Sequence, residues 1–178
     1  MVTVVLCGSK EDWQTGQVLR RALNTYGGVQ YCGPNTVVGG VKEPSFLLWD
    51  CTEVPKMEHM NGILVFKNSF CSQKGKIADG VLPVLDSQNE AAAEILRKSG
   101  CIALTCGTAP RDTVSIASLR QDESVVSLQR SVITLSGEVV EPHDFPVHVK
   151  KEGGVYPLLA ACSVLLLAGV PSAKGYTF

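Results

Sequence analysis

Short runs of β-branched and aliphatic residues alternate with amphipathic segments along the first part of the chain, beginning with the run VTVVL. Continuous apolar runs of this kind are typical of strands covered on both faces, as in parallel sheets. The pattern predicts strands at 2–6, 30–32, 46–50, 62–67, 81–85 and 102–105. It predicts helices at 10–26 and 87–98. Strands that alternate with helices in this way predict a three-layer α/β domain with a mostly parallel sheet.

The pattern changes between residues 113 and 149, where β-branched alternation is interrupted by the turn signals SGE and EPHD. This region predicts a small antiparallel β extension. An apolar segment, YPLLAACSVLLLAGVP, then predicts a buried helix at 157–168. The almost wholly apolar stretch from Leu158 to Val170 has 13 residues, too few to span about 30 Å of hydrocarbon. We therefore expect a single domain over 1–178 and no membrane segment.

The turn after the first strand, CGSKEDW, has the strand–glycine–helix order of many phosphate-binding turns. Amides at a helix N-terminus attract anions, so Gly8, Ser9 and Lys10 are the candidate nucleotide-binding residues. However, Ser9 and Asp12 have the spacing of a capping box, with Ser9 as the expected N-cap. Glu11 and Asp12 would also repel a triphosphate by about 1–3 kcal/mol per charge pair. The residues therefore favour a structural turn over a weak nucleotide contact.

Several stretches, in the same order, resemble the central domain of the Mur ligases, the ATP-dependent enzymes that add amino acids to peptidoglycan precursors. The stretches are TVVLCGSKEDWQTGQVLRRAL at the place of the phosphate loop, FLLWDCTE, GILVFKNSF, LPVLDSQNEAAAEILRKSGCIALTCGTAPRDTVSIAS and YPLLAACSVLLLAGVP. The resemblance covers nearly the whole chain and implies a P-loop fold. It places Asp50 at the position of an acidic residue that helps to hold magnesium, and Asn68 at that of an asparagine ending the next strand.

The chain departs from the family where the chemistry takes place. The family loop G-x-x-G-K-[ST]-[ST] needs a lysine and a hydroxyl where this sequence has Asp12 and Trp13. The family's D-H step is missing, and only 17 residues separate Asn68 from Asp86, so the segment of the modified lysine is largely deleted. The family's N-terminal and C-terminal domains are not expected either. The comparison therefore implies a pared-down domain with no catalytic residue.

Acidic residues at strand ends are further candidates. Asp50 and Glu53 follow a predicted strand on the side where doubly wound sheets place ligands, so a magnesium role for Asp50 competes with a turn or cap role. Asp86 lies at another strand-to-helix junction, where capping of the helix at 87–98 is the expected role.

Two arginines and two histidines are weaker candidates. Arg111 and Arg130 have side chains that can bind a carboxylate or phosphate, although surface pairing, for Arg111 with the adjacent Asp112, is the commoner role. His143 and His148 belong to no recognisable nucleophile motif. A Cys–His pair that forms only in space stays open as an alternative.

Composition narrows the possible partners and compartment. Sixteen basic and seventeen acidic residues give a net charge of −1, which offers no basis for binding nucleic acid or an anionic membrane. The seven cysteines contain no C-x-x-C pair and predict reduced, buried thiols, and only three histidines, including His59, are available for a zinc site. The N-terminus has no signal-peptide pattern, so we expect a cytoplasmic protein.

These observations favour a non-catalytic, Mur ligase-like protein that acts as an interaction or regulatory module with an unidentified protein partner. The resemblance alone implies a link to cell-wall precursor synthesis. No cofactor is expected under this interpretation. The alternative is a nucleotide-binding protein or ligase-like enzyme that uses ATP and magnesium at a rearranged loop, Gly8–Trp13. A further alternative is a subunit whose missing parts are supplied by another chain.

Overall fold

The computed structural model describes residues 1–40, 42–58, 60–120, 123–149 and 153–178. Within these ranges the helices are α1 (Trp13–Thr25), α2 (Glu90–Ser99) and α3 (Val155–Leu167). The strands are β1 (Val2–Cys7), β2 (Val29–Gly33), β3 (Thr36–Val38), β4 (Phe46–Cys51), β5 (Gly62–Phe66), β6 (Val81–Asp86), β7 (Leu104–Gly107), β8 (Val114–Leu119), β9 (Ser124–Leu128), β10 (Val132–Ile133), β11 (Val139–Val140), β12 (His143–His148) and β13 (Tyr176–Thr177).

One large sheet organises the molecule, with the described strands in the order β13-β12-β9-β8-β7-β6-β5-β1-β4-β2-β3. Its centre, from β2 through β4, β1, β5, β6 and β7 to β8, is parallel throughout. The predicted antiparallel extension is confirmed: β9 and β12 pair antiparallel beyond β8 and continue the same sheet. Only the short pair β10–β11 forms a separate two-stranded sheet within the described ranges.

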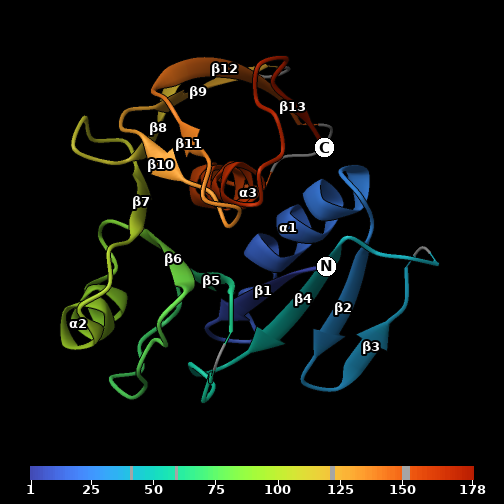
Figure 1. The fold of residues 1–178 in the computed structure, drawn as a ribbon, viewed down its shortest axis with the longest axis vertical. Coiled ribbons are helices and arrows are strands. Elements are labelled where there is room, and N and C mark those ends of the chain that lie inside the picture. Colours follow the sequence, from blue (N-terminus) through green and yellow to red (C-terminus); the bar gives the residue numbers. More distant parts are fainter. Residues whose placement is uncertain (41, 59, 121–122, 150–152) are drawn as a thin grey trace.

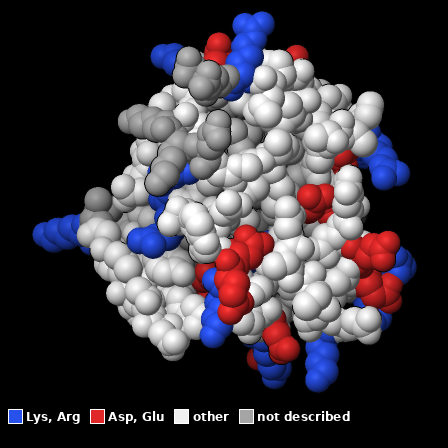
Figure 2. Space-filling model, turned by 180° about the vertical axis from the view of Figure 1, so that it is seen from behind, with Lys and Arg blue, Asp and Glu red and all other residues white. Residues whose placement is uncertain are grey.

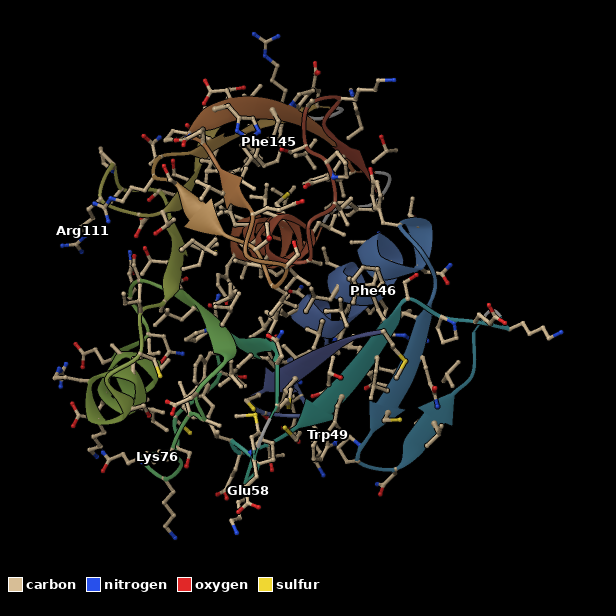
Figure 3. The ribbon with its side chains drawn as sticks, in the orientation of Figure 1. Phe46, Trp49, Glu58, Lys76, Arg111 and Phe145 are labelled. Carbon is tan, nitrogen blue, oxygen red and sulfur yellow. The ribbon has the colours of Figure 1, made fainter. Side chains whose placement is uncertain are left out.

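The helices lie on both faces of the sheet, which confirms the predicted three-layer α/β fold. Helices α1 and α3 pack against each other on one face, and β8, β9 and β12 curve around α3 (Figure 1). On the opposite face α2 packs with apolar residues of β1, β5 and β6. Phe46 and Phe145 belong to the core on the α1–α3 side, whereas Arg111 points away from the molecule (Figure 3).

Helix α3 is buried along its whole length, as the apolar segment predicts. From Tyr156 to Leu167 every residue is buried. The hydroxyl of Tyr156, in the first turn, donates a hydrogen bond to the carbonyl oxygen of Phe66 at the end of β5, which ties the start of the helix to the sheet. None of the helices in the described ranges has the length and apolar character needed to cross a membrane.

The predicted starts of the first two helices were too early, whereas α3 begins two residues before its predicted start at 157. Helix α1 begins at Trp13 rather than at residue 10, because residues 9–12 form a turn in which the Asp12 amide donates to the Ser9 carbonyl oxygen at 3.2 Å. Helix α2 begins at Glu90 rather than at residue 87, because Asn89 is the N-cap and its Oδ1 accepts from the Ala92 amide at 2.9 Å. Asp86 instead accepts from the Gln88 amide at 2.9 Å, so its predicted capping role is wrong.

Truncation of α3 tests how much stability its burial provides. We expect Leu165→Ala to lower the free energy of unfolding by about 2–5 kcal/mol, because the side chain is fully buried and leaves a cavity. Ile102→Ala is the matched control, since that side chain is 94% exposed and its truncation removes little packing. Urea unfolding followed by circular dichroism measures both; equal effects of the two changes would contradict the central role of α3.

Candidate functional site

The turn after β1 lies at the carboxyl edge of the parallel sheet, beside the ends of β4 and β5. Gly8 is buried there, and a Cβ atom at this position would lie 2.6 Å from the Cβ of Lys67. Only a glycine therefore allows the turn and the end of β5 to approach so closely. The glycine that makes this turn similar to a phosphate loop therefore leaves room for the side chain of Lys67.

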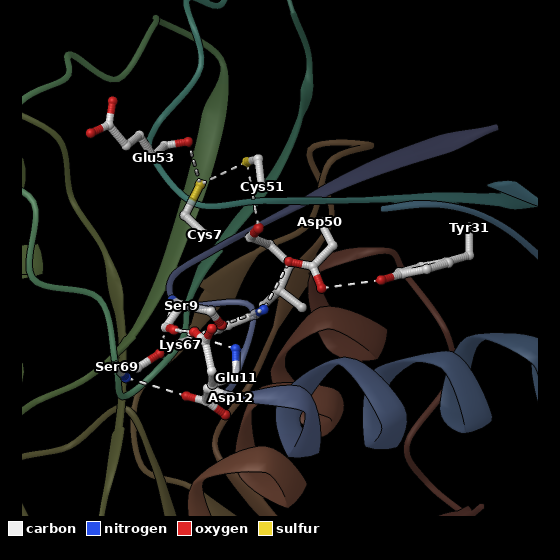
Figure 4. Close-up of polar contacts among 11 residues, drawn as sticks. Cys7, Ser9, Glu11, Asp12, Tyr31, Asp50, Cys51, Glu53, Lys67 and Ser69 are labelled. Atoms are coloured by element: carbon white, nitrogen blue, oxygen red, sulfur yellow. Dashed lines mark hydrogen bonds and ion pairs between the residues drawn. The ribbon is translucent and has the colours of Figure 1, made fainter. Parts of the chain in front are cut away.

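That side chain is a fully buried lysine. Lys67 has no exposed side-chain surface, and its Nζ lies 2.8 Å from Asp50 Oδ1 at the end of β4. The same ammonium donates to the carbonyl oxygen of Ser9 at 3.1 Å. The second carboxylate oxygen of Asp50 accepts from the Tyr31 hydroxyl at 3.2 Å, which burial and the nearby carboxylate keep protonated by raising the pKa of Tyr31. The four groups form one polar cluster (Figure 4).

A second set of bonds holds the turn closed from the other side. The Ser9 amide donates to the Ser69 hydroxyl at 3.1 Å, and the Ser69 amide donates to Asp12 Oδ2 at 3.2 Å. Asn89 Nδ2 anchors the segment that carries Lys67 and Ser69, through bonds to the carbonyl oxygens of Lys67 and Phe70. The turn after β1 and the segment after β5 are therefore bound to each other at several points.

The predicted phosphate-binding amides are largely engaged within the protein. The Gly8 amide donates to the Cys51 carbonyl oxygen at 3.1 Å and the Ser9 amide to Ser69, while the side chain of Lys10 is exposed. The predicted capping box is wrong, because Asp12 accepts from Ser69 rather than from Ser9. Ser9 is not the N-cap either; its hydroxyl donates to the Glu11 carboxylate.

The cleft in front of the turn is acidic. A hollow of about 770 Å³ lies between the α1 and α3 N-termini and the ends of β5, β6 and β7, and Glu11, Asp12 and Asp86 line it. The hydrogen bond from Ser9 lowers the pKa of Glu11, so this carboxylate is ionised at neutral pH. Basic side chains are scattered mostly around the rim of the rear face in Figure 2. The charges around the cleft therefore oppose a polyphosphate.

Two cysteines lie at the same edge, on the opposite side of the sheet from α1. Cys7 and Cys51 are paired residues of β1 and β4, and their Sγ atoms are 3.3 Å apart. The hydrogen bond with Cys51 and burial raise the pKa of Cys7, and the same hydrogen bond lowers the pKa of Cys51. All seven cysteines are free thiols, but the predicted burial holds only for Cys7, Cys106 and Cys162. The other four are partly exposed or, in the case of Cys71, exposed.

Asp50 was predicted to bind magnesium, but the ammonium group of Lys67 already lies against its carboxylate and would compete with a metal ion. Glu53 offers Cys7 only its backbone carbonyl, and its own side chain is exposed. Among the described residues no group of three or more histidine, cysteine, aspartate or glutamate side chains could hold a metal ion. His59, one of the three histidines, lies outside these residues.

The remaining candidates lie apart from this cluster. Arg111 and Arg130 are exposed, and Asp112 is buried with its Oδ2 accepting from the Ala109 amide. His148 lies 3.7 Å from Glu123. His143 contacts Ser172 at 2.7 Å through Nε2. Its Nδ1 contacts the Glu141 carbonyl oxygen, also at 2.7 Å, so the partners of this ring among the described residues are a buried serine and a backbone carbonyl group, not a cysteine.

Sequence reasoning missed Lys67, Ser69 and Tyr31. A signal for Lys67 was present, because a lysine directly follows the buried run GILVF and a buried ammonium requires an acidic partner. Asp50 ends a neighbouring predicted strand at the same edge of the sheet. Tyr31 and Ser69 carry no comparable signal, since their roles depend on the approach of segments far apart in the sequence.

Comparisons with known proteins agree with this fold. No model of a protein family matches the sequence, and no curated protein matches it. MurF from Acinetobacter baumannii is similar in structure with a TM-score of 0.55 and 12% identity, over 96% of this chain and 43% of that one. For MurF ligase from Thermotoga maritima in complex with ADP, the TM-score is 0.54 and the identity 9%, over 96% and 46% of the two chains.

A third solved structure is the UDP-N-acetylmuramate:L-alanyl-γ-D-glutamyl-meso-diaminopimelate ligase from Neisseria meningitides. Its TM-score is 0.58 and its identity 14%, over 97% of this chain and 63% of that one. The chain thus spans 43% to 63% of the length of these three ligases. The likeness confirms the predicted fold, that of a Mur ligase central domain.

The buried ion pair can be tested by removing each partner. We expect Lys67→Met and Asp50→Asn each to lower the free energy of unfolding by about 3–5 kcal/mol, because each leaves a buried group without its partner. The double variant should lose less than the sum of the two, as measured by urea unfolding. Lys56→Met, which breaks an exposed pair with Glu58, is the control and should change little. Strictly additive losses would show that Lys67 and Asp50 do not stabilise each other.

Proposed function

We propose that this domain is a non-catalytic protein of Mur ligase-like fold, in which the turn that corresponds to the phosphate loop is closed by its own side chains. The observation that carries this proposal is the position of Lys67, whose ammonium lies between Asp50 and the Ser9 carbonyl oxygen. A catalytic loop presents free amides and a lysine to its nucleotide. Here the lysine directly follows β5, faces inward and makes internal contacts only.

The free-energy costs of opening the turn favour a closed turn over nucleotide binding. To expose the turn, a nucleotide would have to separate the buried pair and break the bonds of Ser69 to Ser9 and Asp12. Separating a buried pair costs about 3–5 kcal/mol. Each charge pair that a triphosphate forms with Glu11 or Asp12 adds about 1–3 kcal/mol. These costs exceed the roughly 4 kcal/mol that corresponds to millimolar binding.

The alternative, an ATP–magnesium site at Gly8–Trp13, is the interpretation that a binding experiment must exclude. Magnesium at Asp50 would have to replace the Lys67 ammonium, and the phosphates would have to recruit Gly8, Ser9 and Lys10 from their present arrangement. The hollow beside the turn is large enough for a ligand, so space alone does not decide between the two interpretations.

A fluorescence titration tests nucleotide binding. Trp13 is 57% exposed beside the turn, and Trp49→Phe makes it the only tryptophan of the chain. We expect no saturable change in its emission with ATP and magnesium up to millimolar concentration, and no heat of binding by calorimetry with the unaltered chain.

Micromolar affinity would overturn the non-catalytic proposal. The control is Trp13→Phe, which must abolish any fluorescence change that reports the turn. The triphosphate without magnesium, titrated in parallel, separates a metal-dependent site from simple anion binding.

Exposed apolar side chains on one face of the sheet support a protein-binding role. The face of β4, β2 and β3 that points away from α1 carries Trp49, 41% exposed, and Val37, 71% exposed. Trp49 lies near the end of β4 in Figure 3. β3 is also an edge strand. Exposed aromatic and aliphatic side chains beside a free strand edge are common in protein interfaces.

The partner we propose is a Mur ligase of the same cytoplasm, which would link the domain to cell-wall precursor synthesis. The basis is the likeness to three ligases, of which this chain matches one part. In this arrangement the domain regulates the ligase or completes it as a subunit, and does no ligation of its own.

Interface substitutions test the partner. We expect purified chain to bind one of the Mur ligases from the same cell, and Trp49→Asp with Val37→Asp to weaken that binding at least tenfold by surface plasmon resonance. Ile102→Asp, at another exposed apolar residue, is the matched control and should bind normally. If none of the cell's Mur ligases binds, the proposed link is wrong.

A further inference from the structure

We propose that Cys7 and Cys51 form an oxidation site, a dithiol that a hydroperoxide converts to an interstrand disulfide joining β1 to β4. The inference rests on the positions of the two thiols and does not depend on the proposed loss of ligase activity. It concerns a modification of the protein at the edge of the sheet that carries the closed turn.

The two cysteines are opposite each other in the register of two hydrogen-bonded parallel strands. Adjacent strands lie about 4.8 Å apart, and paired residues direct their side chains to the same face. Disulfides need Cα atoms roughly 4.4–6.8 Å apart, so the backbone spacing already fits. The Sγ atoms are 3.3 Å apart, and a small side-chain rotation is enough to bring them to bonding distance.

Both cysteines are the last residues of their strands, which leaves room for this rotation. Cys7 is followed by Gly8, and Cys51 by a loop. The thiols have only weak contacts besides each other: Cys7 donates to the Glu53 carbonyl oxygen at 3.4 Å and Cys51 to that of Leu6 at 3.5 Å. Breaking these two contacts costs little compared with forming a covalent bond.

The two thiols differ in access, which gives them different roles in the reaction. Cys7 is fully buried, whereas Cys51 is partly exposed. Cys51 is therefore the thiol that meets the oxidant, and Cys7 is the thiol that resolves it. Cys71 is more exposed but belongs to another segment, so it serves as a comparison.

The reaction balances with one hydroperoxide. The Cys51 sulfur, having given up its proton, attacks a peroxide oxygen; the O–O bond breaks, a sulfenic acid forms, and the departing hydroxide takes up a proton as water. The Cys7 sulfur then attacks the Cys51 sulfur, the S–O bond breaks, and hydroxide leaves with the Cys7 proton as a second water. Two thiols and hydrogen peroxide thus give one disulfide and two waters.

The bond would form beside the closed turn. Gly8, next to Cys7, donates its amide to the carbonyl oxygen of Cys51, and Asp50, next to Cys51, holds Lys67. A covalent link between β1 and β4 holds Gly8 and Asp50 in place in the folded protein, and it also restricts the unfolded chain. Oxidation is therefore expected to raise the urea midpoint, and a dithiol reductant to reverse the change.

Mass spectrometry of the intact, undigested chain tests the proposal. After mild hydrogen peroxide treatment we expect the mass of the protein to fall by about 2 Da. After denaturation and alkylation this oxidised protein should carry five alkyl groups instead of seven. Digestion should then release a peptide pair joined by the Cys7–Cys51 disulfide. The peptide map of the unaltered chain is decisive even if a variant fails to fold. Oxidation confined to Cys71, or bridges that join two chains, would overturn the proposal.

Variants assign the two roles. Cys51→Ser should abolish the bridge and the rise in urea midpoint, while Cys7→Ser should leave Cys51 as a sulfenic acid that a dimedone probe captures. Cys71→Ser is the matched control and should form the bridge at an unchanged rate. An intramolecular bridge that forms in Cys51→Ser would have to use another cysteine and would contradict the assignment.

Discussion

The buried ammonium of Lys67 is the constraint on which the carboxyl edge of the sheet depends. A charge without exposed surface needs both an opposite charge and hydrogen-bond acceptors, and Asp50 and the Ser9 carbonyl oxygen supply them. These groups come from the ends of β5 and β4 and from the turn after β1. The pair therefore fixes three segments that are far apart in the sequence, and Gly8 is required because the lysine stem lies against it.

The same edge has several layers of reinforcement. Ser69 accepts from one residue of the turn and donates to another, and Asn89 connects the segment after β5 to the start of α2. On the far side of the sheet, the two thiols lie between the end of β1 and the end of β4. Three ligases have a similar fold, and in this chain the corresponding edge of the sheet is built from internal contacts.

The strands could be predicted from the sequence because continuous apolar runs mark strands that are buried on both faces, as Val2–Cys7 and Gly62–Phe66 are. The exposed edge strand Thr36–Val38 lacks that mark and was missed. The start of α1 was misplaced because Ser9 and Asp12 have the chemistry of capping residues but bind Ser69 and Glu11 instead. The lysine after the buried run GILVF indicated that an acidic partner was needed, but its pairing with Asp50 depends on which strand ends the fold brings together.

The burial of α3 has a consequence for synthesis of the protein. This helix covers the inner face of β5, β6, β7 and β8, yet it follows them in the chain. At 5–20 residues per second, a ribosome needs roughly 5–20 s to proceed from β5 to the end of α3. During that interval an apolar sheet face has no cover in the nascent chain. Such a face is a binding site for holding chaperones, so newly made chains should depend on them more than the small size of the domain suggests.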